Sequence, residues 1–283
     1  MRRPLRALFY GQTHEHAPGK LETLKKMRDE YEIVAIVDDF PRRSPMYRDQ
    51  AWDTAGYPVV SEEEAWRIPD IDVGFVEVTN RDLMEIAAKF AERGIPMHCD
   101  KPCGEDFEAY RRVVETCRAK GIPFQIGYMY RTNPALTFVR DFVRAGHLGK
   151  VGFVEADMNH AYNHDNYAAY MQTFAGGILC RRLRVDGTNG TLDLCPIERF
   201  DGEELTLTLS LKNAAGGQPA GRHEVGFGVQ TDRYAAQLLD LAAIVRGEKP
   251  NDQDYDRDLR VHELVLRMAR GESTNQEGIS RSC

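Results

Sequence analysis

Short apolar runs alternate with segments of helical periodicity from the start of the chain to about residue 127. Runs with so few polar positions are typical of parallel strands that are covered on both faces. Strands that alternate with helices at this spacing predict βαβ units, so we expect an α/β fold with a doubly wound Rossmann sheet. The predicted strands are 5–10, 33–37, 73–78, 97–99 and 123–127, and the predicted helices are 20–30, 61–64, 81–93 and 106–120.

A different pattern follows the predicted helix 133–145. In Leu205–Leu211 every second residue is leucine and the residues between carry hydroxyl groups, as in a strand with one covered face. Several such strands before two further helices predict an α+β domain with a mainly antiparallel sheet. The chain is therefore divided into a nucleotide-binding domain, 1–127, and a substrate or oligomerisation domain, 128–283. The other elements expected there are strands 151–158, 183–185, 191–195 and 224–229, and helices 232–246 and 256–269.

Composition excludes several classes of protein. The 283 residues carry a net charge of -7 with a pI near 5.7, which argues against nucleic acid as the main partner. Mean hydropathy is -0.49, and no apolar run approaches the ~18 residues of a membrane span or resembles a signal peptide. Six scattered cysteines without a zinc spacing predict reduced thiols and a cytoplasmic location.

A degenerate dinucleotide loop follows the first predicted strand. Such a loop ordinarily has glycine at three places, so that the backbone can approach a pyrophosphate at a helix N-terminus. Here only Gly11 fits, and Thr13 and His16 stand at the other two places. An ordinary strand–turn–helix connection would explain the same letters. We predict that Gly11, Thr13 and His14 contact a cofactor, and that His14 and His16 bind cofactor or solvent rather than catalyse.

Asp38 ends the second strand, 27 residues after Gly11. An acidic residue at this place holds the ribose diol of an adenosine and repels a 2′-phosphate, so it favours NAD over NADP. The alternative is a turn aspartate, because Asp39 and Pro41 follow. Arg42 and Arg43 would suit a 2′-phosphate and keep NADP possible.

Polar residues also follow the later strands of the predicted sheet. Thr79 and Asn80 come after the fourth strand, where they either make a turn or line the nicotinamide side of the crevice. Asp100 and Lys101 follow the fifth strand and precede Pro102. A lysine held between a carboxylate and a proline is suited to bind a substrate hydroxyl and move its proton, and we predict that Lys101 is catalytic. The alternative is a surface lysine at a turn.

Several motifs in a fixed order resemble the Gfo/Idh/MocA family of glucose–fructose oxidoreductase and inositol dehydrogenase. Asp100-Lys101-Pro102 is similar to the family's Glu-Lys-Pro motif, and the segment 127–134 (GYMYRTNP) to its strand-to-helix crossing. The further similar segments are 148–151, 183–192 and 232–234. The resemblance implies NAD(P)-dependent oxidation or reduction of a sugar, cyclitol or similar polyol. It also implies a homodimer or homotetramer that pairs the open faces of the second sheets.

The resemblance further implies roles for residues near Lys101. Asp100 would orient Lys101, and Tyr128 and Arg131 would line the substrate crevice. The rival interpretation is a nucleotide-binding protein without catalytic activity that serves regulation or assembly.

The chain departs from the family pattern at several places. Asp82 stands where the family has histidine, and Asp100 where it has glutamate. Near 180–182 the segment with the family's Asp-x-Gly-x-His motif is absent, either because the chain is shortened or because it is joined across an omitted segment. His160 and His164 are predicted substitutes on the substrate side, as a base or beside a metal, although exposed loop residues would look the same. No metal site is assigned.

Overall fold

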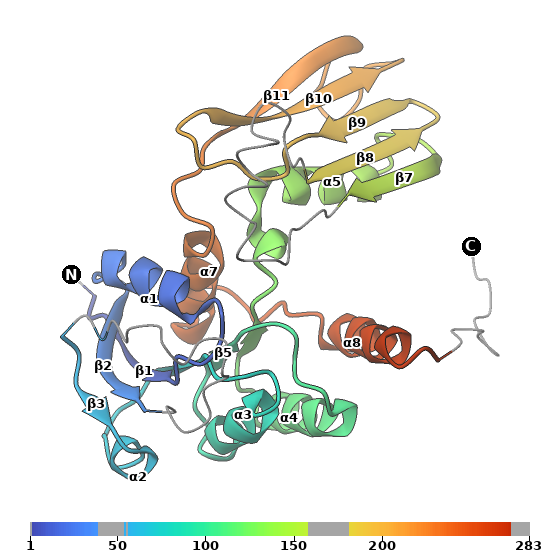
Figure 1. Ribbon diagram of the computed structural model, residues 1–283. Coiled ribbons are helices and arrows are strands. Elements are labelled where there is room, and N and C mark those ends of the chain that lie inside the picture. The colour runs from blue at the N-terminus through green and yellow to red at the C-terminus, as the bar shows by residue number, and fades with distance from the viewer. Residues whose placement is uncertain (1, 39–53, 55, 158–180, 273–283) are drawn as a thin grey trace, which may run out of the picture. The chain divides into compact units, whose positions relative to one another are not determined.

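The computed structural model describes residues 2–38, 54, 56–157 and 181–272. The described chain forms two compact units (Figure 1). The first unit combines residues 1–128 with the C-terminal part from 237, and the second comprises residues 129–236.

The first unit is built on a six-stranded parallel sheet with the order β3-β2-β1-β4-β5-β6. The predicted Rossmann sheet is therefore confirmed, with the short β3 as an edge strand that the sequence pattern had not indicated. Its middle strands are almost fully buried, because helices cover both faces. The strands are β1 (Leu5–Tyr10), β2 (Tyr31–Val37), β3 (Val59–Val60), β4 (Val73–Val76), β5 (Met97–Cys99) and β6 (Phe124–Ile126).

The helices of this unit begin and end at residues that stabilise helix termini. Ser61 and Glu64 form a capping box at the start of α2. Asp106 caps α4 by accepting a hydrogen bond from the amide of Ala109, and Gly121 ends it with a φ of 67°. The helices are α1 (Ala17–Lys26), α2 (Glu62–Ala65), α3 (Leu83–Glu92) and α4 (Phe107–Lys120).

The last two helices, α7 (Ala235–Val245) and α8 (Tyr255–Ala269), pack with the first unit. The sequence-based division had placed them in the second domain. Their contacts explain the difference: the Tyr31 hydroxyl donates to the carbonyl of Leu238, and the amide of Phe124 donates to the hydroxyl of Tyr255. The boundary after the parallel sheet lies at residue 128, one residue from the predicted position.

The second unit contains η3 (Met129–Thr132), α5 (Pro134–Arg144) and a five-stranded antiparallel sheet with the order β11-β10-β9-β8-β7. The four leucines of β10 are buried, whereas Thr206, Thr208 and Ser210 between them are half-buried on the other face. The predicted assignment of the two faces is therefore confirmed. The strands are β7 (Val151–Asp157), β8 (Arg182–Gly187), β9 (Gly190–Leu194), β10 (Glu204–Leu211) and β11 (Gly221–Val229).

The structure bears on two expectations, the absence of a membrane span and the reduced state of the cysteines. None of the described helices is long and apolar enough to cross a membrane. Cys99, Cys103 and Cys117 are buried free thiols, as expected, but Cys195 is disulfide-bonded, which corrects the expectation for that residue. Burial raises the pKa of the Cys117 thiol to about 12, so this side chain stays protonated at neutral pH.

Candidate functional site

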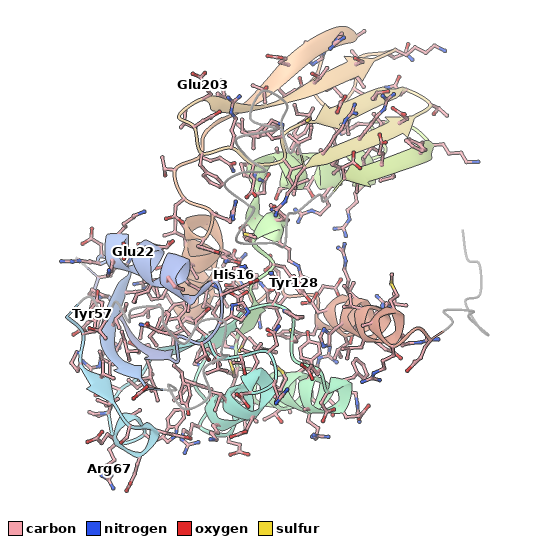
Figure 2. The ribbon with its side chains drawn as sticks, in the orientation of Figure 1. His16, Glu22, Tyr57, Arg67, Tyr128 and Glu203 are labelled. Atoms are coloured by element: carbon pink, nitrogen blue, oxygen red, sulfur yellow. The ribbon has the colours of Figure 1, made fainter. Side chains whose placement is uncertain are left out.

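The candidate site lies at the carboxyl ends of β1, β4 and β5. β1 and β4 are parallel neighbours in the sheet but not in sequence, so the direction in which successive strands are added across the sheet reverses between them. Ligands of doubly wound folds bind in the crevice at such a switch point. Figure 2 labels His16, which directly precedes α1 at this edge. We call the ionisable side chains gathered here the buried cluster; its members are His16, Lys20, Glu77, His98 and Asp100.

Lys20 of α1 is the centre of the buried cluster and is fully buried. Its Nζ lies 2.7 Å from Asp100 Oδ2, 2.6 Å from His98 Nε2 and 3.1 Å from Glu77 Oε1. Asp100 and His98 accept hydrogen bonds from this ammonium group, and Glu77 lies within ion-pair distance of it. Burial alone would lower the pKa of Lys20, but the two carboxyl groups raise it above its ordinary value. Lys20 is therefore a charged lysine inside the protein.

His98 of β5 is neutral and its tautomer follows from its partners. Lys20 has only hydrogens to donate, so Nε2 must accept and Nδ1 must carry the ring proton. Nδ1 then donates to Gln125 Oε1 at 2.9 Å, and Gln125 Nε2 donates to the carbonyl of Gln237 at 3.0 Å. Burial, with help from Lys20, lowers the pKa of His98 to about 3. The chain of hydrogen bonds links α1, β5, β6 and α7.

The two carboxyl groups of the cluster have opposite protonation states at neutral pH. Burial and the neighbouring Asp100 raise the pKa of Glu77 to about 8, although Lys20 opposes the shift. Burial also disfavours the charged form of Asp100, but Lys20 and His16 outweigh it and hold that pKa well below its usual range. Of these two carboxyl groups, Asp100 is therefore the anion that balances the charge of Lys20.

Asp100 joins the cluster to the predicted catalytic lysine. Its Oδ2 accepts from Lys20, and its Oδ1 accepts from the backbone amide of Lys101 at 2.7 Å and lies 3.1 Å from His16 Nδ1. Asp100 therefore contacts Lys101 through the main chain, which fixes where the lysine side chain begins. That side chain is half-buried.

The loop after β1 brings together the residues predicted to contact a cofactor. Gly11 has a φ of 81°, which favours glycine, and Thr13 Oγ1 accepts from the amide of Thr79 at 3.0 Å. The amide of His14 donates to the carbonyl of Glu77, and the amide of His16 donates to His14 Nδ1. The amides of His14 and His16 thus donate to acceptors within the protein. In a loop with three glycines, backbone amides at these places would be open to a pyrophosphate.

Two further polar residues lie at this edge, where the sequence predicts contacts with a cofactor. Asp38 is exposed at the end of β2, where a carboxylate meets the adenosine ribose. Asn80 is half-buried beyond β4, and its Oδ1 is a buried atom without a hydrogen-bond partner among the described residues. A ribose hydroxyl or a carboxamide N–H would supply the missing donor. These two positions support the predicted roles of Asp38 and Asn80 toward such a cofactor.

A metal ion suits the site poorly, although ligand atoms of His14, His16 and Asp100 lie within 4.8 Å of one another. The Lys20 ammonium is 2.7 Å from Asp100 Oδ2 and would repel a divalent cation. His14 Nδ1 already accepts from the His16 amide. Burial lowers the pKa of His14 to about 4, so its ring is neutral at physiological pH.

The predicted substrate residues are only partly described. Tyr128 follows β6 and packs against the core of the first unit, and Figure 2 labels it; Arg131 lies in η3 of the second unit. His160 and His164 lie outside the described residues, as do Arg42, Arg43 and the chain from 158 to 180 that precedes Arg181. The absence of the Asp-x-Gly-x-His segment therefore stays a prediction.

Sequence interpretation missed Lys20, Glu77 and His98. Each stands at a place that the pattern marks as buried: Glu77 and His98 interrupt apolar runs, and Lys20 precedes Leu24 by one helical turn. A charged or polar residue at a buried position needs partners, so these interruptions were a signal for a polar network.

Comparison with known proteins finds a family match within the first unit and a shared fold beyond it. The model of the oxidoreductase family with an NAD-binding Rossmann fold, GFO_IDH_MocA, matches residues 11–128. The rhizopine catabolism protein MocA of Rhizobium meliloti is 30% identical over 105 residues, which are 37% of this chain and 31% of MocA. The chain spans less than half the length of the curated relatives it matches.

Solved structures extend the likeness of fold to the second unit. An aldose-aldose oxidoreductase from Caulobacter crescentus, complexed with glycerol, aligns with 95% of this chain and 98% of its own, with a TM-score of 0.65 and 19% identity. KijD10, a 3-ketoreductase from Actinomadura kijaniata in complex with NADP and TDP-benzene, aligns with 95% and 98%, with a TM-score of 0.66 and 15% identity. Residues 11–128 are thus similar to the Gfo/Idh/MocA family of oxidoreductases, and the two-unit fold is shared with these solved structures.

Proposed function

We propose that the protein is a nicotinamide-dependent oxidoreductase that acts on a sugar, cyclitol or similar polyol or keto-sugar. The observation that carries the proposal is the gathering of Asp38, Asn80, Asp100 and Lys101 at the carboxyl edge of one parallel sheet, beside its switch point. The names of related proteins support the substrate class: MocA takes part in rhizopine catabolism, and the Caulobacter structure is an aldose-aldose oxidoreductase.

In this proposal the bound cofactor accepts or donates hydride, and the protein positions and protonates the substrate. Lys101 binds the reacting oxygen with its ammonium group and assists proton transfer. Asp100 fixes the backbone of Lys101, and Lys20 fixes Asp100. Tyr128 and Arg131 contribute to the substrate crevice, as the family resemblance implies.

We propose NAD(H) as the preferred cofactor, because the exposed Asp38 carboxylate would repel a 2′-phosphate. Titration of NADH and NADPH against their own fluorescence measures the preference. In the variant Asp38→Asn the ratio of the affinity for NADH to that for NADPH should fall. Asp29 is an exposed aspartate outside the site, so the control Asp29→Asn should leave this ratio unchanged. Tighter binding of NADPH by tenfold or more, about 1.4 kcal/mol, would contradict the assignment and point to Arg42 and Arg43.

Turnover with a panel of sugars and cyclitols tests the activity itself. The competing candidate is a nucleotide-binding protein with a regulatory or assembly role. It is favoured by the loop after β1, where the amides of His14 and His16 already have protein acceptors and leave fewer donors for a pyrophosphate. Nucleotide binding without turnover of any substrate in the panel would select this candidate.

We also propose a homodimer or homotetramer, formed through the half-buried hydroxyl face of the second sheet at Thr206, Thr208 and Ser210. Light scattering of the purified protein measures its native mass. A mass equal to the 32.1 kDa of one chain would contradict the assembly.

A further inference from the structure

We infer that His16, held in place by Asp100, is the group that exchanges a proton with the substrate oxygen. This inference rests on the proposed oxidoreductase function and adds a residue to it. The sequence had indicated contact with cofactor or solvent, because His16 stands where a dinucleotide loop ordinarily has glycine. The contacts of the ring point to a different role.

The imidazole of His16 lies between two carboxyl groups. Nδ1 is 3.1 Å from Asp100 Oδ1 and Nε2 is 3.4 Å from Glu15 Oε1. Asp100 is buried with 1% of its side chain exposed, whereas Glu15 is on the surface and the ring itself is 22% exposed. A histidine with one nitrogen on a fixed carboxylate and the other toward the surface has the arrangement of a general acid–base pair.

Asp100 is suited to hold this ring because it remains an anion. Lys20, fully buried behind it, donates to Oδ2 and leaves Oδ1 for Nδ1–H of His16 and the amide of Lys101. The other ionisable groups around the ring do not supply a competing cation: His14 is neutral above a pKa of about 4, and Glu77 is uncharged below a pKa of about 8. Asp100 therefore stabilises the positive charge that His16 gains when it takes a proton.

The same oxygen sets the position of His16 relative to the predicted catalytic lysine. Because Asp100 Oδ1 contacts both the His16 ring and the Lys101 backbone, the two residues meet at the carboxyl end of β5. His16 comes from the loop after β1 and reaches across the switch point to β5. It thus stands at the crevice where doubly wound folds bind their ligands.

In the oxidative direction the substrate O–H bond breaks and its proton binds Nε2, while the C–H bond breaks and its electron pair leaves as hydride to the oxidised nicotinamide dinucleotide, so that a carbonyl forms. Nδ1–H stays on Asp100 throughout, and Asp100 is a positioning residue. The proton then leaves to solvent past Glu15. Reduction follows the same path in reverse.

The variant His16→Asn tests the role, because its amide nitrogen can still donate to Asp100 Oδ1 but has no titratable atom. We expect turnover to fall by on the order of 10²–10⁴, the affinity for NADH to change less than about threefold, and the limb of the pH profile of kcat/KM that reports His16 to disappear. Added imidazole should restore part of the activity of His16→Ala. The matched control is His223→Asn on β11, outside the cluster, which should behave as wild type.

A second measurement does not depend on turnover. Nitrogen-15 NMR of the cofactor-free protein reports the protonation of each ring nitrogen, and we expect Nδ1 of His16 to carry hydrogen in the wild type and to lose this preference in Asp100→Asn. A mixed tautomer in the wild type would overturn the inference.

Four further outcomes also overturn it, and they can be told apart. Unchanged turnover in His16→Asn, with an active wild type, removes only the role of His16. A wild-type protein that binds nucleotide but turns over no substrate removes the proposed function as well. Loss of NADH affinity with full turnover at saturation would make His16 a cofactor contact. Stoichiometric binding of Zn²⁺ that His16→Asn abolishes would make the site a metal centre.

Discussion

Removal of the buried ammonium in the variant Lys20→Met is the sharpest test of the cluster. Methionine has a similar length and no charge, so the change removes a cation that has the Asp100 carboxylate at 2.7 Å and is fully buried. Breaking a buried ion pair by removing one partner typically costs about 3–5 kcal/mol, because the remaining charge is left uncompensated. With an m-value of about 2 kcal/mol/M, the urea midpoint should fall by about 1.5–2.5 M at pH 7.

The stability loss in Lys20→Met should depend on pH, because it depends on the charge of Asp100. In the wild type the pKa of Asp100 is lowered, so Asp100 contributes stability above its unfolded pKa of about 3.9 and that stability is lost as pH falls. In Lys20→Met burial raises the pKa of Asp100 above its unfolded value, so the defect is largest at pH 7 and shrinks as pH falls toward 5.

Urea titrations followed by tryptophan fluorescence measure both effects, because both tryptophans fall within residues 1–128. The matched control is Lys25→Met on the same helix, since Lys25 pairs with Glu22, whose side chain is 53% exposed. Such pairs contribute about 0–1 kcal/mol, so this control should stay near wild type. A loss below about 1 kcal/mol in Lys20→Met, or a loss that grows on acidification, would refute the assignment of Lys20 and Asp100 as a buried ion pair.

Three other predictions concern activity, pH and packing. Lys101→Ala should lower turnover by on the order of 10² or more with little change in nucleotide affinity, and wild-type turnover would refute its role. The pKa of Glu77 is raised to about 8 in the folded protein, so the free energy of unfolding falls as pH rises from the unfolded pKa of Glu77 toward 8. In urea titrations between pH 5 and 8, the variant Glu77→Gln should therefore gain stability relative to wild type. Gly74→Ala should destabilise the protein by about 1–3 kcal/mol, because its new Cβ would lie 2.2 Å from the ring of Phe90. The control Gly152→Ala has open space around its new Cβ and should leave stability unchanged. Equal urea midpoints for the two variants would contradict this packing.

The apolar runs predicted the parallel sheet well because buried parallel strands tolerate few polar residues. The start of α1 was less predictable: the helix begins at Ala17, ahead of the expected Lys20, because Pro18 is compatible with a first helical turn. The two C-terminal helices were recognised as helices but assigned to the wrong unit. Periodicity shows that one face of a helix is covered, and it does not show which sheet covers it.

The candidate site was predictable only where residues follow strand ends. Asp100 and Lys101 could be placed at the crevice edge from the topology that the alternation implied. The helical pattern marks Lys20 as buried, but its partners Glu77, His98 and Asp100 could not be predicted, because they come from strands far along the chain. The ion pairs that allow a charge to be buried are seen only in the folded structure, where residues distant in sequence come together.

The return of α7 and α8 to the first unit makes that unit discontinuous in sequence, with the second unit inserted between its two parts. During synthesis the parallel sheet emerges first, but the main-chain carbonyls of Gln237 and Leu238, which hold Gln125 and Tyr31, emerge only after the whole second unit. While the second unit is synthesised, the surface of the first unit that α7 later covers therefore stays exposed. A ribosome-stalling series should show protease resistance of the first unit only once α7 has left the exit tunnel.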